Sequence, residues 1–204
     1  MDRCTRDFRP LVPVMPRLFV ALDLPDVIKT SLASLMDGLG DVRWLSDDQL
    51  HLTLRFIGEI DNGQARDVED ALSLVQGQPF DLSLKGIGHF PPRSEPRVIW
   101  TGVEHQPELQ ALKRRIDHAL REAGLDRDPK KYRPHVTLAR LRRPPPREAL
   151  AAYLMRHGLF KARAFRSRAS SCSQAGWMVK EPTIRWKRAM IFWLDRAKRR
   201  NWSG

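Results

Sequence analysis

Apolar and polar residues alternate in two stretches of the chain that are close copies of each other. The first is Leu50–Phe56 and the second is Pro134–Arg140, and each contains a His-x-Thr-hydrophobic tetrad. Alternation with a period of two is typical of a half-buried strand, on which residues two positions apart share a face. Each stretch therefore predicts a strand that presents an imidazole and a hydroxyl side by side.

Further helices and strands are predicted around this pair. Runs of apolar and β-branched residues predict strands, and apolar residues at helical spacing, ended by Gly or Pro, predict helices. The predicted strands are 17–23, 80–84 and 97–101, and the predicted helices are about 25–37, 62–76, 107–123 and 147–157. Mixed alternation of this kind predicts an α+β fold in which the two His strands belong to two related halves.

The chain has a net charge of +12, but the charge is unevenly distributed along its 204 residues. Residues 161–204 contain twelve Lys and Arg against two acids, a balance of +10, so the first 160 residues carry only +2. The basic character belongs to the C-terminal tail. The total charge is therefore weak evidence for RNA binding by the folded part, and an anion site there has to be local.

Several features predict a cytoplasmic protein without a membrane segment. The longest apolar runs, such as Leu18–Leu22, are far shorter than the roughly 20 residues of a membrane-spanning helix. Residues 1–14 contain no apolar segment of the kind found in signal peptides. The two cysteines, Cys4 and Cys172, lack the spacing of metal ligands and fit a reducing compartment.

Two histidines and two threonines on neighbouring strands suit chemistry at phosphorus. Imidazole titrates near neutrality, so one histidine can activate an attacking oxygen while the other protonates the leaving oxygen. The hydroxyls of Thr53 and Thr137 can hydrogen-bond the non-bridging oxygens, and the scheme requires neither a metal nor a cofactor. The alternative is that His51 and His135 are buried, hydrogen-bonded strand residues. That alternative would be preferred for one isolated motif, whereas two copies in matching strands favour function.

Four stretches carry a resemblance to a known family. They are Met15–Pro25, Gln49–Glu59, Arg97–Trp100 and Arg133–Arg140. In this order they resemble the opening, the first motif, the middle strand and the second motif of the two-histidine phosphoesterases, and within them the RNA 2',3'-cyclic phosphodiesterases, also known as 2'-5' RNA ligases. The resemblance covers about residues 15–165. It implies two pseudo-symmetric lobes, each an antiparallel sheet backed by helices, that enclose a central cleft carrying the two His-x-Thr strands.

The resemblance also implies an activity and a set of site residues. His51 and His135 would be the acid-base pair, with His51 as the acid toward the 3'-oxygen and His135 as the base toward water. Thr53 and Thr137 would bind the phosphate, as would the cation of Arg140. The implied reaction is hydrolysis of an RNA terminal 2',3'-cyclic phosphate to a 2'-phosphate, with ATP-independent 2'-5' joining as a reverse-type activity. RNA ends or small cyclic nucleotides are the expected partners, and a monomer is the expected state.

Strand parity argues against Arg140, and the roles of Arg55, Trp44 and Trp100 stay open. Arg140 is five positions from His135, so strict alternation places it on the opposite face unless a bulge intervenes. Arg55 has the same parity as His51, but a solvated or structural role suits it at least equally well. Trp44 and Trp100 could stack a nucleobase, although packing in the core is the favoured interpretation of Trp100 because its strand is apolar.

Both ends of the chain depart from the family pattern. We expect an N-terminal extension at residues 1–14, the phosphoesterase domain at 15–166, and an atypical basic tail at 167–204. Reading residues 168–190 from the third base of each codon gives FVLFSSRLDGEGAHYPVEEGYD, which has the missing strand, turn and strand. We therefore expect the tail to be a frame-shifted translation. The alternative is a genuine basic tail that binds RNA.

A noncatalytic module that binds RNA ends is the rival interpretation of the whole chain. It would use the same cleft together with the basic tail. Binding alone would not need two groups that titrate near neutrality, so the presence of both His51 and His135 favours an enzyme.

Overall fold

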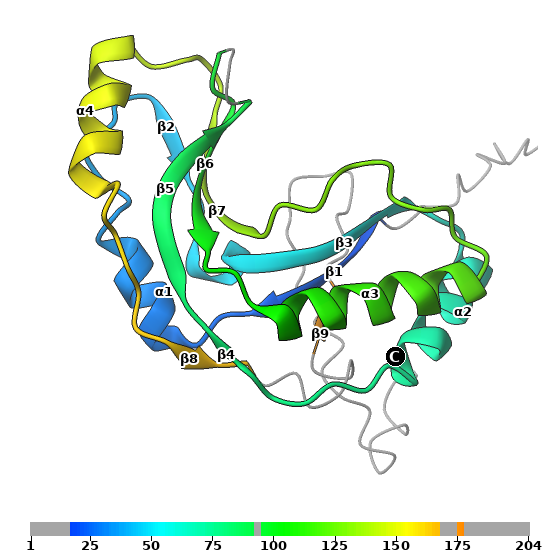
Figure 1. Ribbon diagram of the computed structural model, residues 1–204. Helices are drawn as coiled ribbons and strands as arrows, with labels where there is room; N and C mark the ends of the chain where they lie inside the picture. The colour runs from blue at the N-terminus through cyan, green and yellow to red at the C-terminus, as the bar shows by residue number, and fades with distance from the viewer. Residues whose placement is uncertain (1–16, 92–94, 168–174, 178–204) are drawn as a thin grey trace, which may run out of the picture.

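The computed structural model describes residues 17–91, 95–167 and 175–177 (Figure 1). The strands are β1 (Arg17–Asp23), β2 (Val42–Trp44), β3 (His51–Glu59), β4 (Asp81–Leu82), β5 (Leu84–Phe90), β6 (Val98–Val103), β7 (His135–Leu141), β8 (Phe165–Arg166) and β9 (Ala175–Trp177). The helices are α1 (Asp26–Ala33), α2 (Asn62–Ser73), α3 (Pro107–Glu122) and α4 (Arg147–His157).

Seven strands form one antiparallel sheet in two halves. Its order is β5-β6-β7-β3-β1-β9, and β2 also pairs with β7. The two halves meet where β3 pairs with β7, and a single residue pair, Leu52 and Val136, joins them. One half therefore contains the first His-x-Thr strand and the other half contains the second. A separate two-stranded sheet joins β4 to β8.

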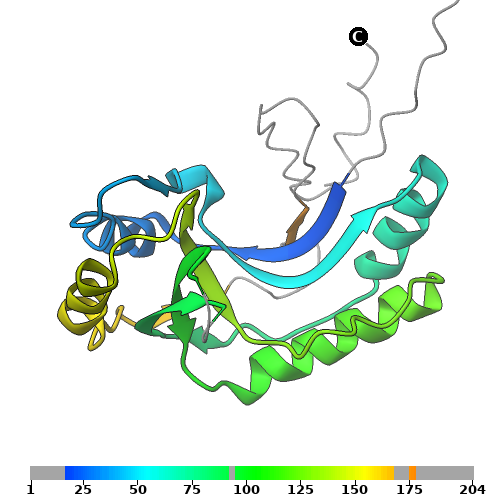
Figure 2. The ribbon, with the colours of Figure 1, turned by 90° about the horizontal axis from the view of Figure 1, so that it is seen from above.

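Each half of the sheet has its own pair of helices. Figures 1 and 2 both show α1 and α4 together at one end of the molecule and α2 and α3 together at the other. The longest helix, α3, begins with Pro at its first turn, where the missing N–H costs nothing. Its inward stripe buries Leu109, Leu112, Ile116 and Leu120, which recur at the three- and four-residue spacing of one helix face.

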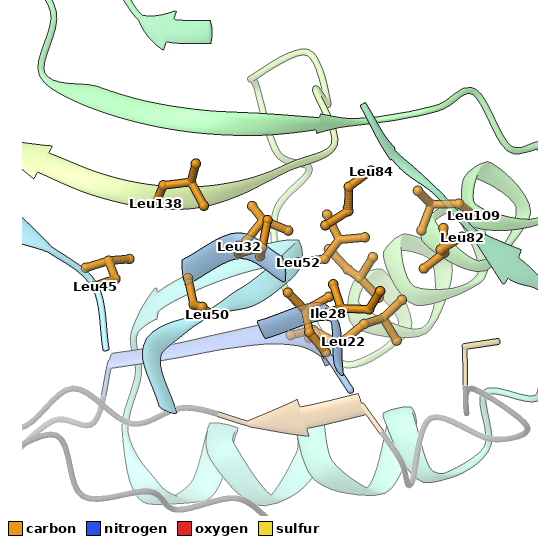
Figure 3. Packing of buried hydrophobic residues seen from close by; sticks show 14 of the residues in the cluster. Leu22, Ile28, Leu32, Leu45, Leu50, Leu52, Leu82, Leu84, Leu109 and Leu138 are labelled. Carbon is orange, nitrogen blue, oxygen red and sulfur yellow. The ribbon is translucent and has the colours of Figure 1, made fainter. Parts of the chain in front are cut away.

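The core lies on the face of the sheet that the helices cover. Leu22, Leu52 and Leu138 from the strands pack there with Ile28 and Leu32 from α1 (Figure 3). On a strand, the residues between such buried positions point to the opposite face. His51, Thr53, His135 and Thr137 are all half-buried and alternate with buried leucines and valines. We call the face that carries these four residues the histidine face.

The predicted fold class is confirmed, since antiparallel strands and four helices make an α+β fold of two helix-backed halves. The strand 17–23 and the helix 147–157 match their predicted bounds. The predicted strand at 80–84 is instead the short β4, followed by β5, which sequence analysis missed. It also missed β2 and β8, because two or three residues are too few to show a period. The predicted central cleft stays a prediction.

The predicted extension at 1–14 and most of the tail at 167–204 lie outside the described residues. Three tail residues, 175–177, are described as β9, which pairs with residues 20–22 of β1. Within the described part of the chain, no helix has the length and apolarity needed to cross a membrane.

Candidate active site

The neighbouring strands β3 and β7 bring the two His-x-Thr motifs side by side on one face of the sheet. Because Leu52 lies opposite Val136 in an antiparallel pair, one step along each strand sets His51 against Thr137 and Thr53 against His135. Leu52 and Val136 are fully buried on the core face. The two histidines and two threonines therefore form a diagonal arrangement on the histidine face, related by a local twofold about the Leu52–Val136 pair. Neither threonine hydroxyl has a hydrogen-bond partner among the described residues.

Both strands carry a β-bulge at the same place, one residue after the threonine. On β3, Thr53 lies opposite Ala21 and Arg55 opposite Val20, so Leu54 is the extra residue. On β7, Thr137 lies opposite Trp100 and Ala139 opposite Ile99, so Leu138 is the extra residue. The side chains after each bulge consequently point to the face opposite to the one that strict alternation predicts.

The bulge at Leu138 places Arg140 on the histidine face. Arg140 lies opposite Val98, which shares a face of β6 with Trp100, the partner of Thr137. The objection from parity therefore does not apply to Arg140. The corresponding position on β3 is Phe56, which is 47% exposed and lies opposite Phe19.

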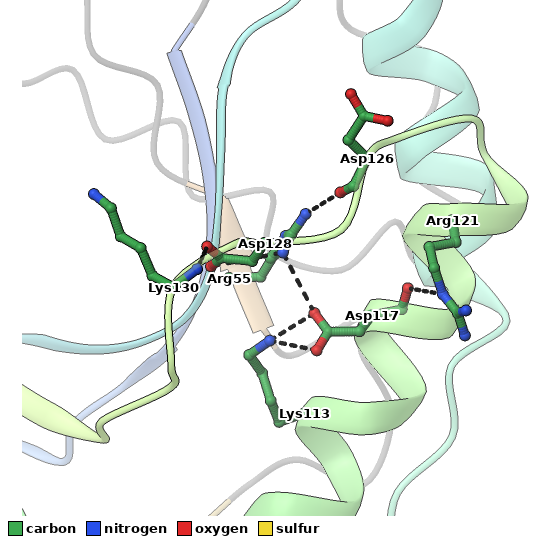
Figure 4. Close-up of polar contacts among 7 residues, drawn as sticks. All are labelled: Arg55, Lys113, Asp117, Arg121, Asp126, Asp128 and Lys130. Atoms are coloured by element: carbon green, nitrogen blue, oxygen red, sulfur yellow. Dashed lines mark hydrogen bonds and ion pairs between the residues drawn. The ribbon is translucent and has the colours of Figure 1, made fainter.

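The bulge at Leu54 turns Arg55 to the core face, away from the histidines. Arg55 is buried, and its guanidinium donates a hydrogen bond to the backbone carbonyl of Asp126 (Figure 4). The same guanidinium lies 3.9 Å from a carboxylate oxygen of Asp117 on α3 and 3.6 Å from one of Asp128. These contacts of Arg55 hold the loop that leads into β7 against β3. The prediction of a structural role for Arg55 is therefore the correct one.

Burial sets the protonation state of His51. Desolvation is the main cause that lowers its pKa, to about 4. The backbone carbonyl of Gln49 and the carboxylate of Asp23 raise the pKa, whereas the positive charges of Arg140 and His135 lower it further. His51 is therefore neutral near pH 7. The influence of Arg140 and His135 also indicates that these two residues lie within electrostatic reach of the His51 ring.

The tautomer of His135 is fixed by the backbone two residues before it. Its Nδ1 lies 2.7 Å from the carbonyl oxygen of Arg133, and because a carbonyl only accepts, Nδ1 carries the proton. The pKa of His135 is lowered by burial, against which the Arg133 carbonyl acts. Neutral His135 therefore keeps a lone pair on Nε2 that is free to accept a proton.

Aromatic rings lie beside both histidines. Phe19 stacks on His51 with ring centroids 4.9 Å apart, and Phe90 meets the His135 ring edge-on at 5.0 Å. Trp100 lies 6.2 Å from His135 and does not belong to the hydrophobic core cluster, so its interpretation as a core residue is wrong. Phe19 and Phe90 were not identified from the sequence, because only the strand register reveals them as neighbours of the histidines.

One glycine makes room for the Trp100 ring. A Cβ atom added at Gly88 would lie 2.4 Å from the ring of Trp100, much closer than two carbon atoms can approach. Gly88 lies directly opposite Trp100 on the neighbouring strand. The absence of a side chain at this position therefore lets the indole lie across β5.

This chain is similar in sequence to proteins named RNA 2',3'-cyclic phosphodiesterase. The RNA 2',3'-cyclic phosphodiesterase of Archaeoglobus fulgidus is 36% identical to it over 136 residues, which cover 65% of this chain and 77% of the relative. The RNA 2',3'-cyclic phosphodiesterase of Methanothermobacter thermautotrophicus is 32% identical over 141 residues, covering 66% of this chain and 76% of the relative.

Solved structures share the fold. The protein TT0787 of Thermus thermophilus superimposes with a TM-score of 0.61 at 24% identity, covering 80% of this chain and 86% of that one. Escherichia coli LigT complexed with 3'-AMP superimposes with a TM-score of 0.56 at 23% identity, covering 81% and 88%. Residues 25–171 match the family described as the 2'-5' RNA ligase superfamily. This match spans most of the sequence, and the chain belongs to that superfamily.

Proposed function

We propose that this protein is a phosphodiesterase that hydrolyses terminal 2',3'-cyclic phosphates of RNA to 2'-phosphates by acid-base catalysis. The observation that carries the proposal is the register of β3 and β7, which puts His51, Thr53, His135 and Thr137 on one face around one point. The name shared by the curated relatives supports the same reaction. RNA ends and small cyclic nucleotides are the proposed substrates, residues 15–166 the proposed catalytic domain, and a cytoplasmic monomer the proposed working form.

In the proposed reaction, water attacks phosphorus while the bond to the 3'-oxygen breaks. His135 accepts the proton of the water through Nε2, which is the nitrogen left free by the contact of Nδ1 with the Arg133 carbonyl. His51, in its protonated form, donates a proton to the departing 3'-oxygen. The ribose keeps the phosphate on its 2'-oxygen. In 2'-5' joining, the 5'-hydroxyl of a second RNA would take the place of water.

The threonines and Arg140 are proposed to bind the non-bridging phosphate oxygens. The hydroxyls of Thr53 and Thr137 can donate to these oxygens, since neither has another partner among the described residues. Charge accumulates on the same oxygens as water adds, and the guanidinium of Arg140 would stabilise it. A noncatalytic RNA-end-binding module remains the rival, but the enzyme names of the relatives disfavour it.

The test uses an oligonucleotide that ends in a 2',3'-cyclic phosphate, incubated with the protein in EDTA. We expect a 2'-phosphate product, and we expect His51→Ala and His135→Ala each to lower kcat by about 10²- to 10⁴-fold. His118→Ala is the matched control, because His118 is an exposed histidine on α3 whose ring faces Glu122. Absence of turnover, or undiminished turnover in both histidine-face variants, contradicts the proposal.

A further inference from the structure

A second arginine lies beside Arg140 on the histidine face. The short strand β2 pairs with β7 so that Arg43 is directly opposite Arg140. The residues on either side of Arg43 point the other way, because Val42 and Trp44 pack against the core. Arg43 is exposed, as is Arg140. The histidine face therefore presents two guanidinium groups on adjacent strands.

These two cations have no anionic partner in the described part of the chain, where no carboxylate forms an ion pair with either of them. Like charges directly opposite each other on neighbouring strands destabilise a sheet. An anion bound between or beside them would remove this cost. Lys85 and Lys161, by contrast, both form ion pairs with Glu104.

The two arginines differ in their distance from the histidines. The charge of Arg140 acts on the pKa of His51, whereas no such effect comes from Arg43. Arg43 lies on the same side of β7 as β3, next to the end of β7 beyond Thr137. The Cα atoms of directly opposite residues on antiparallel strands are about 4.5–5.5 Å apart, so two long arginine side chains at such positions can reach two neighbouring phosphates of one RNA strand.

We propose that Arg43 binds the phosphate next to the cyclic one, namely the phosphodiester on the 5' side of the terminal nucleotide. Arg140 then serves the reacting phosphate and Arg43 serves its neighbour. The protein consequently favours the end of an RNA chain over an isolated nucleoside 2',3'-cyclic phosphate, which lacks the second phosphate. This inference rests on the proposed function, since it names the substrate class of that site.

The experiment compares two substrates and two variants. The substrates are a short oligonucleotide ending in a 2',3'-cyclic phosphate and a nucleoside 2',3'-cyclic phosphate without a 5'-phosphate. For Arg43→Ala we expect KM for the oligonucleotide to rise about five- to tenfold with kcat nearly unchanged, because the contact forms equally in the ground and transition states. We expect the nucleoside reaction to be unchanged within about twofold, and Arg43→Lys to recover part of the loss.

Salt dependence gives a second readout. Removal of one phosphate contact should reduce the slope of log KM against log salt concentration by about one for the oligonucleotide alone. Arg114→Ala is the matched control, because Arg114 is an exposed arginine on α3, away from β2. Circular dichroism melting curves would verify that each variant is folded.

Equal losses on both substrates, or no loss on either, would overturn the inference. A wild-type protein that hydrolyses neither substrate would overturn the proposed function, and a binding measurement then still tests Arg43. In that measurement, a dinucleotide with a terminal 2'-phosphate should bind the wild type more tightly than Arg43→Ala, whereas a nucleoside 2'-phosphate should bind both alike. If Arg43→Ala changes the affinity of neither ligand, the inference is contradicted whether or not the protein shows turnover.

Discussion

His51 has conflicting requirements as a proposed acid. Burial lowers its pKa to about 4, so in the free protein it holds no proton near pH 7. An acid has to be protonated before it can donate. The negative charge of a bound phosphate favours the charged form of a neighbouring imidazole, so phosphate binding would itself promote protonation of His51. Proton uptake is therefore a property of the complex and not of the free site.

We expect inorganic sulfate to raise the pKa of His51 from about 4 toward the ordinary value near 6.5. Sulfate resembles phosphate but stays fully ionised in this range, so any proton taken up belongs to the protein. The measurement is an NMR titration of the histidine ring protons with and without sulfate. Chloride at equal ionic strength is the control. A His51 titration curve that sulfate leaves unchanged would contradict the assignment of His51 to the phosphate site.

The same low pKa predicts how stability depends on pH. Between pH 6.5 and about 4, the unfolded chain binds a proton at this histidine while the folded chain does not. Acidification through this window therefore favours the unfolded state, and the free energy of unfolding should fall by about 1–3 kcal/mol from this group. Urea denaturation from about pH 4 to 7.5 measures the slope. His51→Gln should flatten it, and an equally steep curve in that variant would refute the explanation.

At the scale of elements, the sequence predicts the two His strands but not their register. The alternation around His51 and His135 correctly predicts β3 and β7, and the repeat correctly suggests two related halves. A bulge shifts the parity by one residue without changing composition, so the period alone misplaces both Arg55 and Arg140. Arg43 was not identified either, because three residues of β2 give no period and its neighbour in space is 97 positions away in sequence.

The packing of β5 against β6 predicts the effect of Gly88→Ala. The new methyl group would collide with the ring of Trp100 and push it out of its position beside His135. We expect a loss of about 1–3 kcal/mol in stability and a lower kcat/KM. Thermal melting and a turnover assay measure the two effects. Gly40→Ala is the control, because a Cβ at Gly40 has open space around it. Wild-type stability and wild-type turnover in this variant would show that Trp100 can adopt another side-chain conformation without loss.

The contact between β3 and the loop before β7 predicts the effect of Arg55→Ala. Loss of the guanidinium frees the Asp126 carbonyl and leaves Asp117 and Asp128 without this cation. We expect a destabilisation of about 2–4 kcal/mol, measured by urea denaturation, and faster hydrogen exchange in the loop. Arg114→Ala should change neither. Unaltered loop exchange in Arg55→Ala would mean that other contacts hold the loop.

At the scale of the whole molecule, the origin of the tail stays a prediction from the sequence. The family match ends at residue 171, close to where the tail departs from the family pattern. Only residues 20–22 of β1 pair with β9, so most of that strand has no partner on this side within the described residues. An exposed strand edge is a site for pairing with other chains.

We expect resequencing of the gene to reveal a frame shift near codon 168. A protein that continues from there with the alternative reading frame should melt at a higher temperature and aggregate less, because a complete hairpin would cover the β1 edge. Differential scanning calorimetry and light scattering measure these effects. Independent reads that confirm the present frame, or equal stability of the two proteins, would support the genuine basic tail.

The paired bulges have a consequence for selectivity between the two ribose oxygens. A cyclic phosphate has two ester bonds of nearly equal shape, and a site with true twofold symmetry would cleave either. The bulges set Phe56 and Arg140 at equivalent positions of the two halves, one apolar and one cationic. Binding the nucleotide in the reversed orientation would exchange the positions of its charged part and its nucleobase relative to Phe56 and Arg140. If His51 and His135 act as proposed, the difference between Phe56 and Arg140 would therefore distinguish the two ester bonds of the cyclic phosphate.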